Sequence, residues 1–119
     1  MSVPVARLAR LPVVLVLALA ALAAPLSVAA APDAEAAQSL ARSNNGFKCH
    51  SVSKEKDGPS FKKTAEKYKG KADAQARLVH HLTSGEKAKF PDGHEEDHKI
   101  INTKDEAQVK NLVDWILVQ

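Results

Sequence analysis

The sequence predicts an all-α domain of about four helices. Apolar residues recur at helical spacing in four stretches, and Gly or Asn follows three of these stretches. Strand signals are absent, because no stretch alternates apolar and polar residues over the length of a strand. A segment of different composition precedes the helical part.

That leading segment has the pattern of a secretory signal peptide. Arg7 and Arg10 precede an apolar run at residues 11–26, and small residues follow the run. The run is shorter than the roughly 20 residues that a transmembrane anchor needs. We therefore expect residues 1–30 to be cleaved, leaving an exported domain of residues 31–119 in the periplasm without membrane insertion.

The mature chain is small and close to neutral. Without Arg7 and Arg10 the net charge of +3 becomes about +1, which indicates no nucleic-acid or membrane partner. A domain of this size buries barely enough surface to be stable without a disulfide cross-link, a metal or a cofactor.

Cys49 is the only cysteine in the sequence. It could form an intermolecular bridge, act as a reactive thiol, or attach a group covalently.

The first two predicted helices flank this cysteine. An apolar stripe begins after Asp33, and residues 44–46 end it; its members are Ala36, Ala37, Leu40 and Ala41. Residues 48–57 show no periodicity, and the pair Gly58-Pro59 marks a turn. A short second helix then carries Phe61, Ala65 and Tyr68 and ends at Gly70.

Two further helices complete the domain. Residues 72–84 form the third, with Gly85 as its C-cap and an apolar face of Gln75, Leu78, Val79 and Leu82. His80 and His81 lie away from this face on a helical wheel, so we expect them on the surface. A polar loop follows. Thr103 and Glu106 suggest a capping box before a closing helix that carries Val109, Leu112, Val113, Trp115 and Ile116.

The chemistry of the chain is concentrated in Lys48-Cys49-His50. Haem attachment normally shows as C-x-x-C-H, in which two thiols add to the haem vinyl groups and the histidine ligates the iron. Here Gly46 replaces the first cysteine, so the motif G-F-K-C-H would form one thioether. The alternative is a buried thiol beside a surface histidine.

Four segments support the haem interpretation by their order and spacing. They are Leu40-Ala41, Gly58-Pro59-Ser60-Phe61, residues 68–74 and the closing segment of residues 112–117. Through them the chain resembles the short bacterial class I cytochromes c over nearly its whole mature length. The resemblance implies a cytochrome c-like fold around one haem c, electron transfer with redox partner proteins, and no enzymatic activity.

The resemblance also implies roles for individual residues. Cys49 would supply the single thioether and His50 the proximal iron ligand, while the carbonyl of Pro59 would accept the N–H of the His50 ring. The shell around the haem would include Phe61, Leu78, Leu82, Leu112 and Trp115. The lysines of residues 54–71 have the pattern of a solvated face, which in this family steers acidic partners.

The distal ligand departs from the family, in which it is usually a methionine before the last helix. The only methionine here is Met1. The loop of residues 90–98 offers His94 and His98, and counting back from Trp115 favours His98 over His94. A distal face that is open or bound by water is the third option. Histidine ligation would give a lower reduction potential than methionine ligation.

The sequence is also compatible with two other functions. With an open distal face, the chain would be a haem sensor that binds a small ligand. In a periplasmic copper or zinc protein, His94 and His98 would share one helical face and bind metal with Cys49 or His50. Motifs for catalysis by the polypeptide itself are missing: there is no Gly-rich phosphate loop, serine-centred nucleophile motif or H-E-x-x-H.

Overall fold

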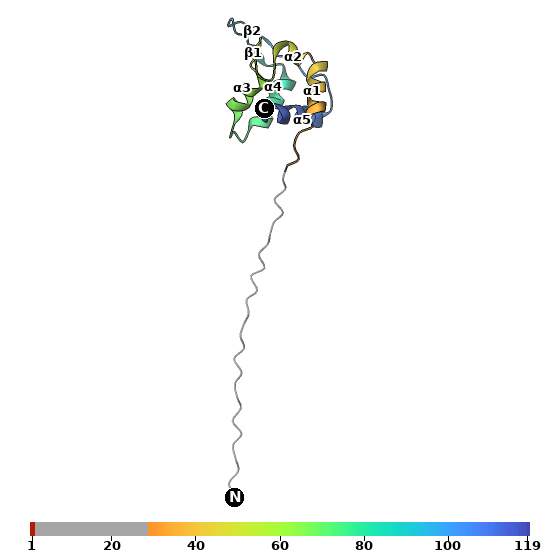
Figure 1. Cartoon of the computed structure of the whole chain (residues 1–119), viewed down its shortest axis with the longest axis vertical. Coiled ribbons are helices and arrows are strands. Elements are labelled where there is room, and N and C mark those ends of the chain that lie inside the picture. Colours follow the sequence, from red (N-terminus) through yellow and green to blue (C-terminus); the bar gives the residue numbers. More distant parts are fainter. Residues whose placement is uncertain (2–28) are drawn as a thin grey trace.

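A computed structural model of the chain describes Met1 and residues 29–119. The predicted signal peptide lies almost wholly outside the described residues. The described part contains five helices and one short hairpin, and its last helix lies between the other elements (Figure 1). Among the described residues, no helix combines the length and apolarity needed to cross a membrane.

Helix α1 (Ala34–Ser43) and helix α2 (Gly46–Cys49) form the segment that leads to the cysteine. The side chain of Asp33 caps α1 by accepting the N–H of Ala36 at 3.0 Å. Asn45 adopts the left-handed conformation, with a φ of 59°, and so allows the chain to turn between the two helices. The sequence did not predict α2, because one turn of helix is too short to show a periodic pattern.

Helix α3 (Phe61–Tyr68) and helix α4 (Ala74–Ser84) match the predicted second and third helices. The side chain of Ser60 caps α3 by accepting the N–H of Lys63. Gly85 ends α4 with a φ of 69°, as its predicted C-cap role requires. Gln75 is exposed rather than inward-facing, and its amide donates to Asp114 at 2.6 Å.

An antiparallel hairpin replaces the predicted loop. Strand β1 (Lys87–Lys89) pairs with strand β2 (Glu95–Asp97), and Lys87 lies opposite Asp97. These strands consist mainly of charged residues, which have weak strand propensity, and each is too short to show alternation. The hairpin is stabilised across the strands by opposite charges, with Lys87 Nζ 2.6 Å from the Asp97 carboxylate.

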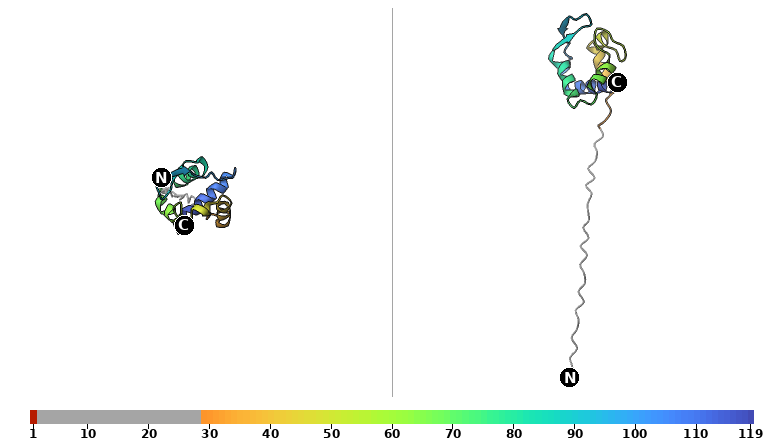
Figure 2. Two further views of the ribbon diagram at one scale, coloured as in Figure 1. Left: turned by 90° about the horizontal axis from the view of Figure 1, so that it is seen from above. Right: turned by 90° about the vertical axis from the view of Figure 1, so that its left-hand side faces the viewer.

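Helix α5 (Glu106–Leu117) closes the chain and organises the rest. The predicted capping box is wrong: the side chain of Asp105 caps α5 by accepting the N–H of Ala107. Thr103 instead accepts the N–H of Asp105. Helices α1, α3 and α4 all pack against α5, with α4 and the hairpin on one side and α1 to α3 on the other (Figure 2).

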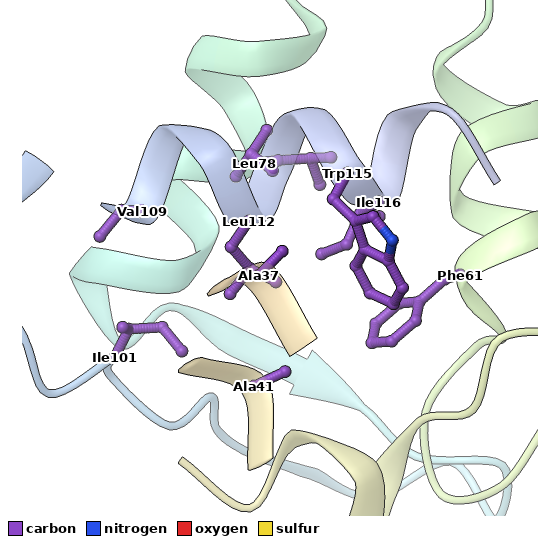
Figure 3. Close-up of a cluster of buried hydrophobic side chains, with 10 residues drawn as sticks. Ala37, Ala41, Phe61, Leu78, Ile101, Val109, Leu112, Trp115 and Ile116 are labelled. Atoms are coloured by element: carbon purple, nitrogen blue, oxygen red, sulfur yellow. The ribbon is translucent and has the colours of Figure 1, made fainter. Parts of the chain in front are cut away.

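The hydrophobic core lies along the inner face of α5 (Figure 3). Val113 is completely buried, and the ring of Trp115 meets that of Phe61 edge-on, with the centroids 5.4 Å apart. Such an edge-to-face pair stabilises by about 1 kcal/mol beyond the buried area. The other buried members of this cluster are Ala37, Ala41, Leu78, Ile101, Val109, Leu112 and Ile116.

Candidate functional site

A mainly apolar pocket opens between the two sides of the molecule, with α5 at its base. Its enclosed cavity has a volume of about 200 Å³, and the empty space is about 910 Å³ when the open mouth is included. Its apolar lining comes from Ala41, Phe61, Leu78, Leu82, Ile101, Leu112 and Ile116. Its chemically active lining residues are Cys49, His50, His81 and His98. Trp115 does not line the pocket and lies behind Phe61.

Helix α2 brings Cys49 and His50 to one wall of this pocket. The N–H of His50 donates to the carbonyl of Gly46 at 2.9 Å, which closes the single turn. His50 then leaves the helix with an extended backbone. The Cys49 thiol is free and half-buried. The adjacent thiol and imidazole therefore both reach the same pocket.

A hydrogen bond fixes the orientation of the His50 ring. Nδ1 of His50 lies 2.7 Å from the carbonyl oxygen of Pro59, the contact expected from the family resemblance. A carbonyl only accepts, so Nδ1 is the donor in this contact, and in the neutral form of the ring Nε2 keeps its lone pair. The ring also stacks on Phe61, with 5.4 Å between centroids and 21° between planes. The hydrogen bond and the stacking together hold the His50 ring in one orientation.

Gly58 makes this orientation of His50 sterically possible. A Cβ atom at position 58 would lie 2.7 Å from Nδ1 and 3.0 Å from Nε2 of the ring. The main-chain N–H of Gly58 also donates to the carbonyl of Cys49 at 2.7 Å, which holds the turn close to the pocket wall that carries the cysteine. The Gly58-Pro59 turn therefore serves to bring backbone close to the imidazole.

His98 stands across the pocket from His50. The centroids of the two rings are 6.3 Å apart, and the planes are inclined at 45°. Nδ1 of His98 lies 3.0 Å from the carbonyl oxygen of Lys99, so this nitrogen donates and Nε2 again keeps its lone pair. Burial lowers the pKa of His98, and the neighbouring imidazoles of His81 and His50 lower it further.

A third imidazole, that of His81, lines the same pocket. Its ring centroid is 4.2 Å from that of His98, and its side chain is 29% exposed. The sequence prediction of a surface position was wrong for this residue. The spacing Leu78, His81 and Leu82, three and four residues apart, carried the missed signal. His80 is on the surface as predicted, with its side chain 67% exposed.

His94 lies in the hairpin connection, outside the pocket lining. Its ring stacks on Phe90 and contacts the carboxylates of Asp92 and Glu96. The hydrogen bond with Asp92, followed by that with Glu96, raises the pKa of His94. Strand β2 separates His94 from His98, so the two do not share a helical face. Within residue 1 and residues 29–119, no three His, Cys, Asp or Glu side chains form a metal cluster.

Comparison with known proteins identifies the family. The model of the cytochrome c family matches residues 34–118. The chain belongs to the cytochrome c family. It is 36% identical to cytochrome c-552 of Nitrosomonas europaea over 84 residues, covering 71% of this chain and 79% of that protein. It is also 36% identical to cytochrome c-551 of Allochromatium vinosum over 93 residues, covering 73% and 89% of the two chains.

Solved structures agree with this assignment. The class 1 cytochrome MtoD of Sideroxydans lithotrophicus ES-1 is 72% identical, with a TM-score of 0.71, covering 74% of this chain and 97% of MtoD. Nitrosomonas europaea cytochrome c552 is 31% identical, with a TM-score of 0.56, covering 68% and 96%. The chain is therefore a class I cytochrome c, a member of an electron-carrier family rather than an enzyme, and its expected cofactor is haem c.

Proposed function

We propose that this cytochrome is a periplasmic electron carrier whose haem is held by one thioether to Cys49 and by two histidines, His50 and His98. The bound haem iron would supply a one-electron cycle between the ferrous and ferric states. The signal-peptide pattern of residues 1–30 supports export. The partners would be redox proteins, as for other electron carriers.

The distance between the His50 and His98 rings carries the proposal. A metal–imidazole bond is about 2 Å long, and two such bonds plus the radius of each ring separate the centroids by roughly 6 Å. The separation here is 6.3 Å, and both rings have a free Nε2. His94 offers no comparable arrangement, because its two nitrogens contact Asp92 and Glu96.

The remaining pocket residues suit a covalently held haem. The Cys49 thiol and the His50 ring line one wall, and the apolar side chains around them exclude water. Gly46 also lines this wall but carries no thiol, so Cys49 would form the only thioether. The Pro59 carbonyl would make the His50 ring a more basic ligand. Histidine on both sides of the iron would lower the reduction potential relative to His-Met ligation.

Lysines at the pocket would guide the partner. Lys48 and Lys99 are exposed and line the pocket, one on each side of it. Positive charge at that place would attract an acidic redox protein, with an association rate that falls as salt is added.

Visible spectroscopy of the purified protein tests the ligands. The oxidised and dithionite-reduced parent should be low-spin. The His98→Ala variant should become high-spin, and the matched His94→Ala variant should keep the parent spectrum. A high-spin parent would support the haem sensor instead, and a His98→Ala variant that stays low-spin would exclude His98 as the sixth ligand.

A pyridine haemochrome assay tests the attachment. One thioether should place the α-band between the bands of b-type and ordinary c-type haem. Acid extraction should leave haem on the parent and release it from a Cys49→Ser variant. Release of the haem from the parent would show that Cys49 forms no thioether.

A further inference from the structure

His81 and Glu86 form a hydrogen-bonded pair beside the distal histidine. Nδ1 of His81 lies 2.6 Å from Oε1 of Glu86, so the imidazole N–H donates to the carboxylate. The His81 ring is tilted by 41° against the His98 ring at a centroid distance of 4.2 Å. His81 thereby covers one face of the His98 ring, while Nε2 of His98 stays free.

Glu86 connects this pair to the main chain of the distal ligand. The N–H of His98 donates to the carbonyl of Glu86 at 2.9 Å, so one residue contacts His81 by its side chain and His98 by its backbone. Glu86 lies between the end of α4 and strand β1. The helix, the hairpin and the distal histidine therefore meet at this residue.

Resting on the proposed ligation by His98, we propose that His81 and Glu86 are positioning residues of the distal site. The hydrogen bond between them holds the Glu86 backbone and the His81 ring where they keep His98 directed into the pocket. Without it, His98 would leave the iron more readily. The pair thus determines how easily an external ligand replaces His98.

Cyanide titration of the ferric holoprotein measures this replacement, because cyanide binds only after the sixth ligand has left. The His81→Leu variant still has a bulky side chain at position 81 but lacks the N–H that donates to Glu86. We expect its cyanide dissociation constant to fall about tenfold, which is about 1.4 kcal/mol. The His81→Gln variant keeps a donor and should stay within about twofold of the parent.

His80 provides a matched control on the same helix. Its Nε2 lies 3.4 Å from the same carboxylate, but its side chain is outside the pocket lining. The His80→Leu variant should bind cyanide like the parent. If it matches His81→Leu, or if His81→Leu equals the parent, the positioning role is refuted.

Two further measurements separate the possible failures. If His81→Leu does not fold, Glu86→Ala removes the same hydrogen bond from an exposed position and should give the same tenfold change; parent-like binding would refute the role. A high-spin parent, or a low-spin His98→Ala variant, would refute the proposed His98 ligation and this inference together. A low-spin parent with unchanged cyanide binding in the variants would refute only this inference.

Discussion

Replacing Gly58 with alanine should displace the ring of His50. The added Cβ would lie 2.7 Å from Nδ1 of His50 and 3.0 Å from Nε2, closer than packed atoms allow. Gly58 is not among the glycines with positive φ in the described residues, which are Gly70, Gly85 and Gly93. The cost of the substitution is therefore steric rather than conformational.

The size of the effect follows from two contributions. Overpacking of this kind costs about 1–3 kcal/mol. Moving the ring also breaks the hydrogen bond to Pro59, which contributes about 1 kcal/mol. Together they lower the free energy of unfolding by about 2–4 kcal/mol. For a small domain this corresponds to a decrease of about 1–2 M in the urea concentration at the unfolding midpoint.

Urea unfolding of the holoprotein, followed by far-UV circular dichroism, checks this value. Gly70→Ala is the matched control, because Gly70 has a φ of 73° and nothing lies within 4 Å of an added Cβ. That variant should lose only about 1 kcal/mol, from backbone strain, and keep the parent's visible spectrum. If Gly58→Ala loses no more than Gly70→Ala and keeps the parent spectrum, the steric reasoning is wrong.

Two further predictions concern the core and the hairpin. Val113→Ala should lower the free energy of unfolding by about 2 kcal/mol because Val113 is fully buried. Val118→Ala, at an exposed position, should change it by less than about 0.5 kcal/mol. Equal losses of the two variants in urea unfolding would contradict the assigned core. By NMR, His94 should titrate above the ordinary histidine pKa, and Asp92→Asn should bring its pKa back toward that value. Protonated His94 therefore contributes fully to hairpin stability below the ordinary histidine pKa, and this contribution is lost as the pH rises through the raised pKa of His94. An unchanged His94 pKa in the Asp92→Asn variant would refute the contact.

The grouping of residues around His50 could be predicted because these residues are close in sequence. Cys49, His50, Pro59 and Phe61 lie within a short segment, and the turn at Gly58-Pro59 is visible in the sequence. The long helices were predictable for a similar reason. Their apolar positions repeat at helical spacing over two turns or more, and Asp33 and Gly85 mark two of the ends.

The single-turn helix α2 and the cap of α5 were not predictable in the same way. Helix α2 depends on the left-handed turn at Asn45, and no periodic pattern can appear in four residues. At α5, both Thr103 and Asp105 are good capping residues. The structure selects Asp105, because Thr103 accepts the N–H of Asp105 before the helix begins.

The distal side depends on how the hairpin returns the chain to the pocket. Pairing of Lys87 with Asp97 ends the hairpin one residue before His98, whose N–H then donates to Glu86. Three residues later the N–H of Ile101 donates to Leu82, which fastens the chain to α4. A slip of one residue in this register would turn each strand side chain to the other face. Which of His94 and His98 lines the pocket therefore depends on the register of two exposed strands with paired charges, and apolar periodicity in the sequence does not indicate that register.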